Sequence, residues 1–242
     1  PALWIPAALA DEGRAAGYTV VDSVSIVGAH LAELIRTHAF ELLSRQDTKS
    51  FCDRVAQENP KVVEDLVPKL LSISTIQKVL QNLLRERVPI RDAVLILEAL
   101  GEAAVSTRNP VLLTEFVRQA LRRIIVEPHL NSQRELMVSV LPAEMENTIE
   151  RAVEHVELNS NLALSPSKIR EVMEEVRRLV GSGEAANVLL TSTGIRYFVR
   201  QMLEPFLPGV TVLSHGEIPA EVKVVVSGTA AGPQTSVAMV RS

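Results

Sequence analysis

The sequence predicts an α+β protein of several subdomains, in which an all-helical middle unit is followed by a small mixed α/β sheet unit. Two patterns support this prediction. Between residues 44 and 127, apolar residues recur at the spacing of amphipathic helices, and prolines separate the segments. After residue 128, short strand-like segments are interleaved with helical ones. Strands that alternate with helices indicate a sheet packed against helices.

Residues 1–22 are predicted to be the end of an N-terminal α/β subdomain that is truncated in this chain. Pro6 suits the first turn of a short helix, which Gly17 would end. Residues 18–21 are β-branched or aromatic and suit a short strand. The chain also begins without an initiator Met or a signal peptide, so we expect it to be a piece of a longer protein.

A long connecting helix is expected over residues 23–43. Asp22 or Ser23 can cap its first turn. Apolar residues then recur at helical spacing as far as Leu42.

The middle unit, residues 44–127, contains five predicted helical segments. Each begins at a capping residue or ends at a proline. They cover residues 47–59, residues 62–71 with a break at Pro68, a helix from Ser72 or Ser74 to Pro89, residues 90–104, and a helix that begins at Asn109.

One joint between these helices is unusual. In residues 83–92, Pro89 breaks one helix and the next is predicted to start at once, at Ile90. Arg91 and Asp92 are placed to pair across the break. This joint is typical of a rigid scaffold that holds partners, and ordinary helical packing is the alternative.

The last unit, residues 128–228, has the composition of a small sheet with helices. Its predicted elements are strands at 135–141, 187–190, 210–213 and 222–226, helices at 142–156, 166–180 and 194–204, and a polar connection at 157–164. Gly181 and Gly183 would end the second of these helices. Residues 229–242 lack periodicity and are predicted to be a flexible tail.

Composition excludes several classes of function. The net charge is −4 and aromatic residues make up 3%, so neither the basic surface nor the stacking residues of a nucleic-acid-binding protein are present. The single cysteine, Cys52, cannot form an intrachain disulfide, and we expect it to be buried as a small apolar residue. No apolar run approaches the roughly 18 residues of a membrane span.

No motif predicts catalysis, a metal or a cofactor. His30 and His38 lie eight residues apart on one helix, too far to share a metal ion. The sequence SHGE at residues 214–217 is interpreted as a tight turn, because catalytic triads converge from separate segments. Gly181 and Gly183 follow a helix, whereas a dinucleotide loop follows a strand. An α/β enzyme built on the last 110 residues stays open as an alternative.

Arg118, Arg122 and Arg123 cluster near a helix C-terminus. Cations there complement the helix dipole. A patch that docks an acidic partner is the alternative.

Several segments, in order from residue 1 to residue 219, resemble one family. They are PALWI at 1–5, GYTVVD at 17–22, AHL at 29–31, ELLSRQ at 41–46, DLVP at 65–68, VLQNLLRERVPIRD at 79–92, residues 96–100 and 113–121, and LSHGEIP at 213–219. None is a catalytic signature, but together they are specific. The chain resembles the C-terminal cytoplasmic half of the FlhA family of flagellar type III export-gate proteins.

The resemblance implies a role in protein transport without catalysis or a cofactor. The parent protein would span the bacterial inner membrane with its N-terminal half, and this part would lie on the cytoplasmic face. It would form a ring, nonameric in the family, and dock complexes of export chaperones with flagellar subunits, helping to order their export. The export ATPase complex and other export-gate membrane proteins would be further partners, and nucleic acid would not.

In that family, chaperones bind a hydrophobic dimple, and part of the dimple would precede residue 1 of this chain. Val21 corresponds to one dimple position. Ala29 corresponds to another, where the family usually has Thr, so a hydroxyl is lost. Ser25 lies one turn before Ala29 on the same helix face and could partly replace it. A homologous gate of a virulence-type (injectisome) secretion system is the alternative function.

Overall fold

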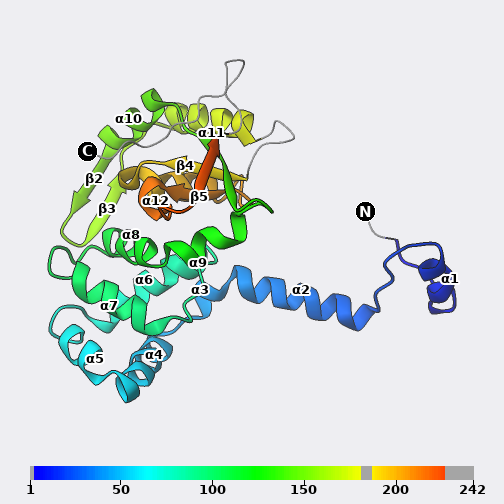
Figure 1. Cartoon of the computed structure of the whole chain (residues 1–242), viewed down its shortest axis with the longest axis horizontal. Coiled ribbons are helices and arrows are strands. Elements are labelled where there is room, and N and C mark those ends of the chain that lie inside the picture. Colours follow the sequence, from blue (N-terminus) through cyan, green and yellow to red (C-terminus); the bar gives the residue numbers. More distant parts are fainter. Residues whose placement is uncertain (1–2, 181–186, 227–242) are drawn as a thin grey trace.

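The computed structural model describes residues 3–180 and 187–226, and there it confirms the predicted α+β class (Figure 1). A helical part comes first, and a parallel sheet with its own helices follows. We refer to residues 3–43 as the arm, to residues 44–129 as the helical unit and to residues 135–226 as the sheet unit. Gly181, Gly183 and the predicted tail at 229–242 lie outside the described residues.

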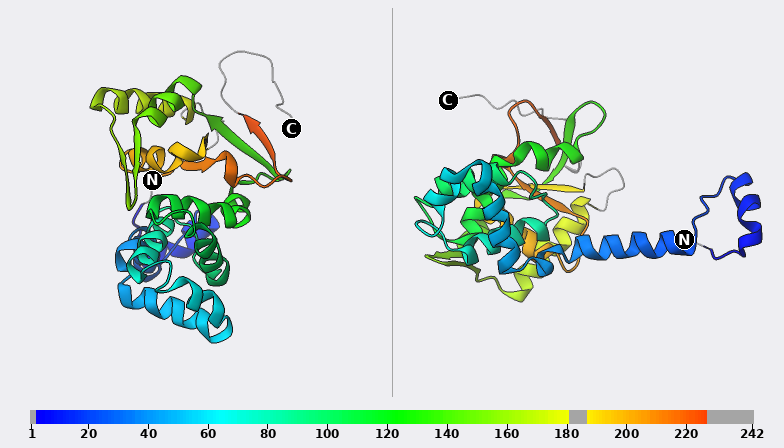
Figure 2. Two further views of the ribbon diagram at one scale, coloured as in Figure 1. Left: turned by 90° about the vertical axis from the view of Figure 1, so that its left-hand side faces the viewer. Right: turned by 90° about the horizontal axis from the view of Figure 1, so that it is seen from below.

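The arm extends away from the rest of the molecule, with α1 at its far end (Figures 1 and 2). Its helices are η1 (Ala7–Leu9), α1 (Ala10–Ala15), α2 (Ser23–Thr37) and α3 (Ala39–Leu42). Gly17, with φ of 86°, follows α1 as predicted. The Asp22 carboxylate caps α2 by accepting a 2.9 Å hydrogen bond from the Ser25 N–H.

Two predictions for the arm are wrong. Residues 18–21 do not form a strand, because no described strand pairs with them to complete the hydrogen bonds that a strand requires. The helix expected over 23–43 is interrupted at His38, and α3 starts in a new direction. The amides of Gln77 and Gln81 then hold the end of α3 by donating to the Leu43 carbonyl at 2.9 and 3.3 Å.

The helical unit is built around α6, whose inward residues Ile76, Val79, Leu80 and Leu83 are 0% exposed. Its elements are α4 (Arg45–Glu58), α5 (Pro60–Leu66), α6 (Ile73–Arg85), α7 (Ala93–Ala103), α8 (Pro110–Ala120), α9 (Arg122–Val126) and η2 (Glu127–His129). Ser44, Ser72 and Asn109 cap α4, α6 and α8 through their side chains. Cys52 is buried as predicted, and burial raises the pKa of its thiol to about 11.

The joint between α6 and α7 differs from its prediction. Helix α6 ends at Arg85, four residues before Pro89, and α7 begins at Ala93. Arg91 and Asp92 do not pair, and neither forms an ion pair with any other described residue. The actual stop is at Arg87, whose φ of 59° cannot continue a helix.

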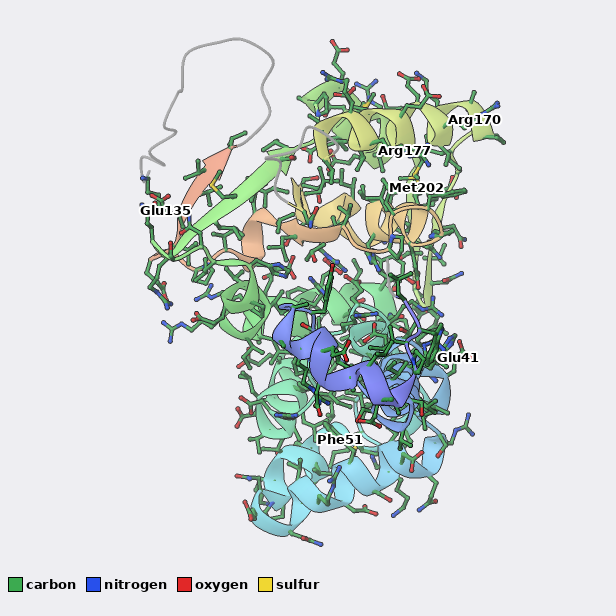
Figure 3. The ribbon with its side chains drawn as sticks, turned by 90° about the vertical axis from the view of Figure 1, so that its right-hand side faces the viewer. Glu41, Phe51, Glu135, Arg170, Arg177 and Met202 are labelled. Atoms are coloured by element: carbon green, nitrogen blue, oxygen red, sulfur yellow. The ribbon has the colours of Figure 1, made fainter. Side chains whose placement is uncertain are left out.

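The sheet unit contains a four-stranded, all-parallel sheet with the order β5-β4-β1-β6. Its strands are β1 (Glu135–Val140), β4 (Val188–Thr191), β5 (Thr211–Ser214) and β6 (Lys223–Val226). Its helices are α10 (Ala143–Ala152), α11 (Pro166–Val180), α12 (Thr193–Leu203) and η3 (His215–Glu217). Figure 3 labels Arg170 and Arg177 on α11, at the end of the molecule opposite Phe51 in the helical unit.

An antiparallel hairpin replaces the predicted end of one helix and the polar connection after it. Helix α10 stops at Ala152, and β2 (Val153–Val156) pairs with β3 (Asn159–Leu162). The amide of Asn109 donates to the carbonyls of Val156 and Asn159 at 2.9 and 2.7 Å. These contacts to α8 hold the hairpin turn, which local sequence could not reveal.

The two faces of the parallel sheet pack against different partners. Leu136, Val138 and Leu190 lie in the same core cluster as α6 and α8. Leu189 and Val212, on the opposite face, join the core made with α10, α11 and α12. The alternation of neighbouring residues Leu189 and Leu190 follows the two-residue period of a strand. The helical and sheet units therefore share a core, and the arm does not contribute its helix α2 to it.

Candidate docking surface

The arm presents the largest apolar residues that the rest of the molecule leaves uncovered. Val24 is 80% exposed, whereas the core of the helical unit is closed to solvent. The exposed apolar residues of α2 are Val24, Ile26, Val27, Leu31, Leu34 and Ile35, and Leu3, Trp4, Leu9, Tyr18 and Val21 add to them from the segment before α2. Exposed apolar side chains gathered on one segment in this way make the arm the candidate interaction surface.

All three predicted site residues lie on this exposed surface. Val21 precedes α2, and Ser25 and Ala29 lie one turn apart on it. The Ser25 hydroxyl is already engaged, since it donates to Asp22 Oδ2 at 2.6 Å. This bond and the N–H of Ser25 lower the pKa of Asp22. Ser25 therefore supports the helix cap, so its hydroxyl is only partly available to replace the one lost at position 29.

A network of buried charges joins the helical unit to the sheet unit. Arg196 of α12 donates two bonds to Glu86, at 2.6 and 2.9 Å, and two to Glu115, at 2.6 and 2.7 Å. Arg118 of α8 donates to Glu86 at 3.1 Å and to Glu217 at 2.6 Å. Such paired, hydrogen-bonded charges fix the angle between the elements that carry them.

The same environment moves the two central carboxyls in opposite directions. Burial alone would raise the pKa of Glu86, but Arg118 and Arg196 together lower it to about 2. Burial dominates at Glu115, and the nearby Glu217 adds to it, so the pKa of Glu115 is raised although Arg196 opposes this. The two arginines therefore stabilise the charged form of Glu86.

Arg118 thus corrects the interpretation of a basic surface patch. It is 1% exposed and forms part of the buried network, so it cannot dock an acidic partner. The turn at residues 214–217 is confirmed, and Glu217 closes it by accepting from the Ser214 N–H at 2.6 Å and from Arg118.

Two cavities flank the β2–β3 hairpin. The larger, about 370 Å³, lies between α3, α6, α8 and the hairpin turn, and Phe40, Lys78, Arg85, Leu158 and Tyr197 are in its lining. The smaller, about 200 Å³, lies between α8 and the start of α12. Two of its ionisable groups, Glu115 and His155, already face Arg196 and the Ser160 hydroxyl. The predicted site residues line neither cavity.

The described residues form no candidate metal site. Over residues 3–180 and 187–226, His, Cys, Asp and Glu nowhere group as a metal site would require. Among the helices of those same residues, none is long and apolar enough to cross a membrane.

The helical and sheet units share a core and a buried charge network, and the arm beside them carries uncovered apolar side chains. The chain belongs to the FHIPEP family, whose pattern it matches over residues 1–223, and the resemblance drawn from the sequence is thereby confirmed.

Curated relatives are flagellar biosynthesis proteins FlhA. That of Bacillus subtilis (strain 168) is 40% identical over 228 residues, which are 93% of this chain and 34% of the relative. That of Escherichia coli (strain K12) is 38% identical over 220 residues, 90% of this chain and 31% of the relative. The chain therefore spans about a third of the length of these relatives.

Several solved structures share the fold. The Chlamydia pneumoniae CdsV protein matches with a TM-score of 0.83 at 26% identity, over 93% of this chain and 66% of that chain. Nonameric EPEC SctV-C matches with a TM-score of 0.73 at 29% identity, over 81% of this chain and 60% of that chain. A structure of CdsV together with CdsO also matches, with a TM-score of 0.82 at 26% identity, over 91% of this chain and 66% of that chain.

Proposed function

We propose that this chain is the cytoplasmic docking platform of a flagellar type III export gate. It would bind complexes of export chaperones with flagellar subunits and help to order their export. The exposed apolar surface of the arm is the observation that carries this proposal. Identity to the curated FlhA proteins is 32–40%, whereas identity to the EscV cytosolic domain from a type III secretion system is 28%, which favours the flagellar function over the virulence-type alternative.

Val21, Ser25 and Ala29 are the residues that we propose to contact the chaperone. An apolar anchor that enters such a surface contributes about 2 kcal/mol or more when it is a binding hot spot. The absence of a hydroxyl at Ala29 would favour an apolar contact at that point over a hydrogen bond.

Titration calorimetry tests this proposal. A flagellar chaperone bound to its filament subunit is titrated into the chain, and into a longer form with the upstream segment that the relatives carry. We expect Val21→Asp to weaken binding at least tenfold, about 1.4 kcal/mol, because a charge would replace an apolar contact. Val105→Asp is the matched control, since Val105 is also an exposed valine but lies in the helical unit. No binding by either folded form would contradict the proposal.

Self-assembly is a second part of the proposal. Because the similar SctV-C and EscV domains are nonameric, we expect a ring of this chain within its parent protein. Sedimentation velocity of the chain at increasing concentration tests this, and a monomer at every concentration would count against assembly through this part alone. Binding of the export ATPase complex and of other export-gate membrane proteins stays a prediction.

A further inference from the structure

One residue of the helical unit, Arg87, makes side-chain hydrogen bonds to helix α2 in the described structure. Arg87 donates from Nη2 to Glu33 Oε1 at 2.6 Å and to Thr37 Oγ1 at 3.2 Å. In the described residues these are the polar side-chain contacts that α2 makes with the helical unit, since its other ion pair, Arg36 with Glu33, stays within the helix. Arg87 therefore contacts α2 near its C-terminal end, close to the body. A small change in the angle of α2 at this end produces a large displacement of the opposite end of the arm.

Arg87 occupies a position where glycine is the usual residue. The N–H of Val88 donates to the Leu83 carbonyl and the N–H of Arg87 donates to the Leu84 carbonyl, both at 2.9 Å. These two bonds, with Val88 packed in the same core cluster as Leu83, form a Schellman motif at the end of α6. Its left-handed residue is Arg87, with φ of 59°. A side chain is unfavourable there, so the backbone alone would be served better by glycine.

The neighbouring residue anchors the same turn from the inside. Glu86, the C-cap of α6, points into the buried network and bonds both Arg118 and Arg196. Two consecutive residues thus reach in opposite directions, one to the shared core and one to the arm. The turn cannot rotate without breaking the buried bonds of Glu86, so the direction of Arg87 is set by the body.

We propose that Glu86 and Arg87 form a clamp that sets the direction of the arm, with Arg87 as the positioning residue. The role of this clamp in export rests on the proposed docking function, because the arm carries Val21, Ser25 and Ala29. The clamp itself is a geometric claim about the chain and can be tested without any partner.

Distance measurement by pulsed electron paramagnetic resonance tests the clamp in the 242-residue chain. Spin labels are attached at His30→Cys on α2 and Glu174→Cys on α11, both exposed. Cys52 is buried with a raised thiol pKa and resists labelling. We expect a single narrow distribution of spin–spin distances in the labelled chain that carries no further substitution.

Arg87→Gly separates the role of the side chain from that of the turn. Glycine suits the left-handed backbone, so the melting temperature should hold or rise. The distance distribution should nevertheless broaden, because the contacts to Glu33 and Thr37 are lost. Arg36→Ala is the matched control, since it removes the other arginine beside Glu33 but no contact to the body, and it should leave the distribution narrow.

The charge exchange Arg87→Glu with Glu33→Arg should restore a narrow distribution. Two results would overturn the clamp. One is a broad distance distribution in the chain that keeps Arg87, and the other is a distribution in the Arg87→Gly chain that is as narrow as with Arg87. In either case the chaperone titration could still succeed, so failure of the clamp and failure of the docking function are distinguishable.

Discussion

Helices α2 and α6 resemble each other in sequence pattern and differ completely in environment. They have 15 and 13 residues, and each has apolar residues at helical spacing. The apolar face of α6 is fully buried, whereas every large apolar residue of α2 is at least 41% exposed. Periodicity therefore predicts a helix and its apolar face, but it does not distinguish a helix whose apolar face is buried in the core from one whose apolar face is exposed.

The charged residues show the reverse contrast. On the arm, the pairs Arg14–Asp11 and Arg36–Glu33 each lie within one helix and are solvated, so they contribute little to stability. In the body, Glu86, Glu115, Arg118, Arg196 and Glu217 are buried together. This contrast predicts that the body keeps a fixed shape and that the arm makes the contacts with partners, and the predictions below test that division.

The largest effect is expected from Glu86→Gln. The substitution leaves Arg118 and Arg196 short of a buried counter-charge, and breaking such a pair costs about 3–5 kcal/mol. Urea unfolding followed by circular dichroism measures the change. Glu98→Gln on the exposed face of α7 is the control and should change stability by less than about 0.5 kcal/mol. Equal effects of the two substitutions would show that the network does not hold the body together.

Truncation of one leucine on each helix makes the comparison direct. Leu80→Ala in α6 should reduce the free energy of unfolding by about 3 kcal/mol, because it opens a cavity in a closed core. Leu31→Ala in α2 should change it by less than about 0.5 kcal/mol. In the chaperone titration the order should be reversed for folded variants. A large loss of stability from Leu31→Ala would contradict the exposed position of Leu31, because it would mean that α2 is buried in a core.

Acid should weaken the body through the same network. The pKa of Glu86 is lowered from 4.5 to about 2 in the folded chain, so its stabilisation is present above pH 4.5 and is lost as the pH falls toward 2. The loss is on the order of 3 kcal/mol. Glu115, whose pKa is raised, opposes this because the folded state binds its proton more readily.

Urea midpoints measured between pH 7 and pH 3 check this dependence. The parent chain should lose stability on acidification, and Glu86→Gln should lose less. If the urea midpoints of both chains fell equally with pH, carboxyl groups other than Glu86 would be responsible for the loss of stability in acid.

The smallest effect is expected from Asn109→Ala. The substitution removes the cap of α8 and the bonds that hold the hairpin turn, at a cost of about 1–2 kcal/mol. Hydrogen exchange should become faster at residues 153–162 while α4 stays protected. Unchanged exchange in the hairpin would mean that β2 and β3 hold together without their contact to α8.

Local sequence was sufficient where local rules determine structure. Ser72 and Asn109 cap helices as predicted, and Pro166 begins α11. It was insufficient where distant segments decide. The β2–β3 hairpin depends on Asn109, which lies about fifty residues before it, and Arg118 is buried because Glu86 and Glu217 approach from other elements.

The clamp residue was missed for a different reason. Arg87 belongs to a joint that the sequence singles out, but the expected partners there were Arg91 and Asp92. A left-handed arginine gives no sequence signal, since glycine or asparagine is the usual indication of that conformation. The site residues Val21, Ser25 and Ala29 came from the family resemblance, and their role stays a prediction.

The most direct test of the division between arm and body is hydrogen–deuterium exchange with and without a flagellar chaperone–subunit complex. We expect new protection in the arm, centred on residues 21–35, with little change in α6 and in the parallel sheet. Protection confined to the sheet unit or to the hairpin cavities, with the arm unaffected, would contradict it.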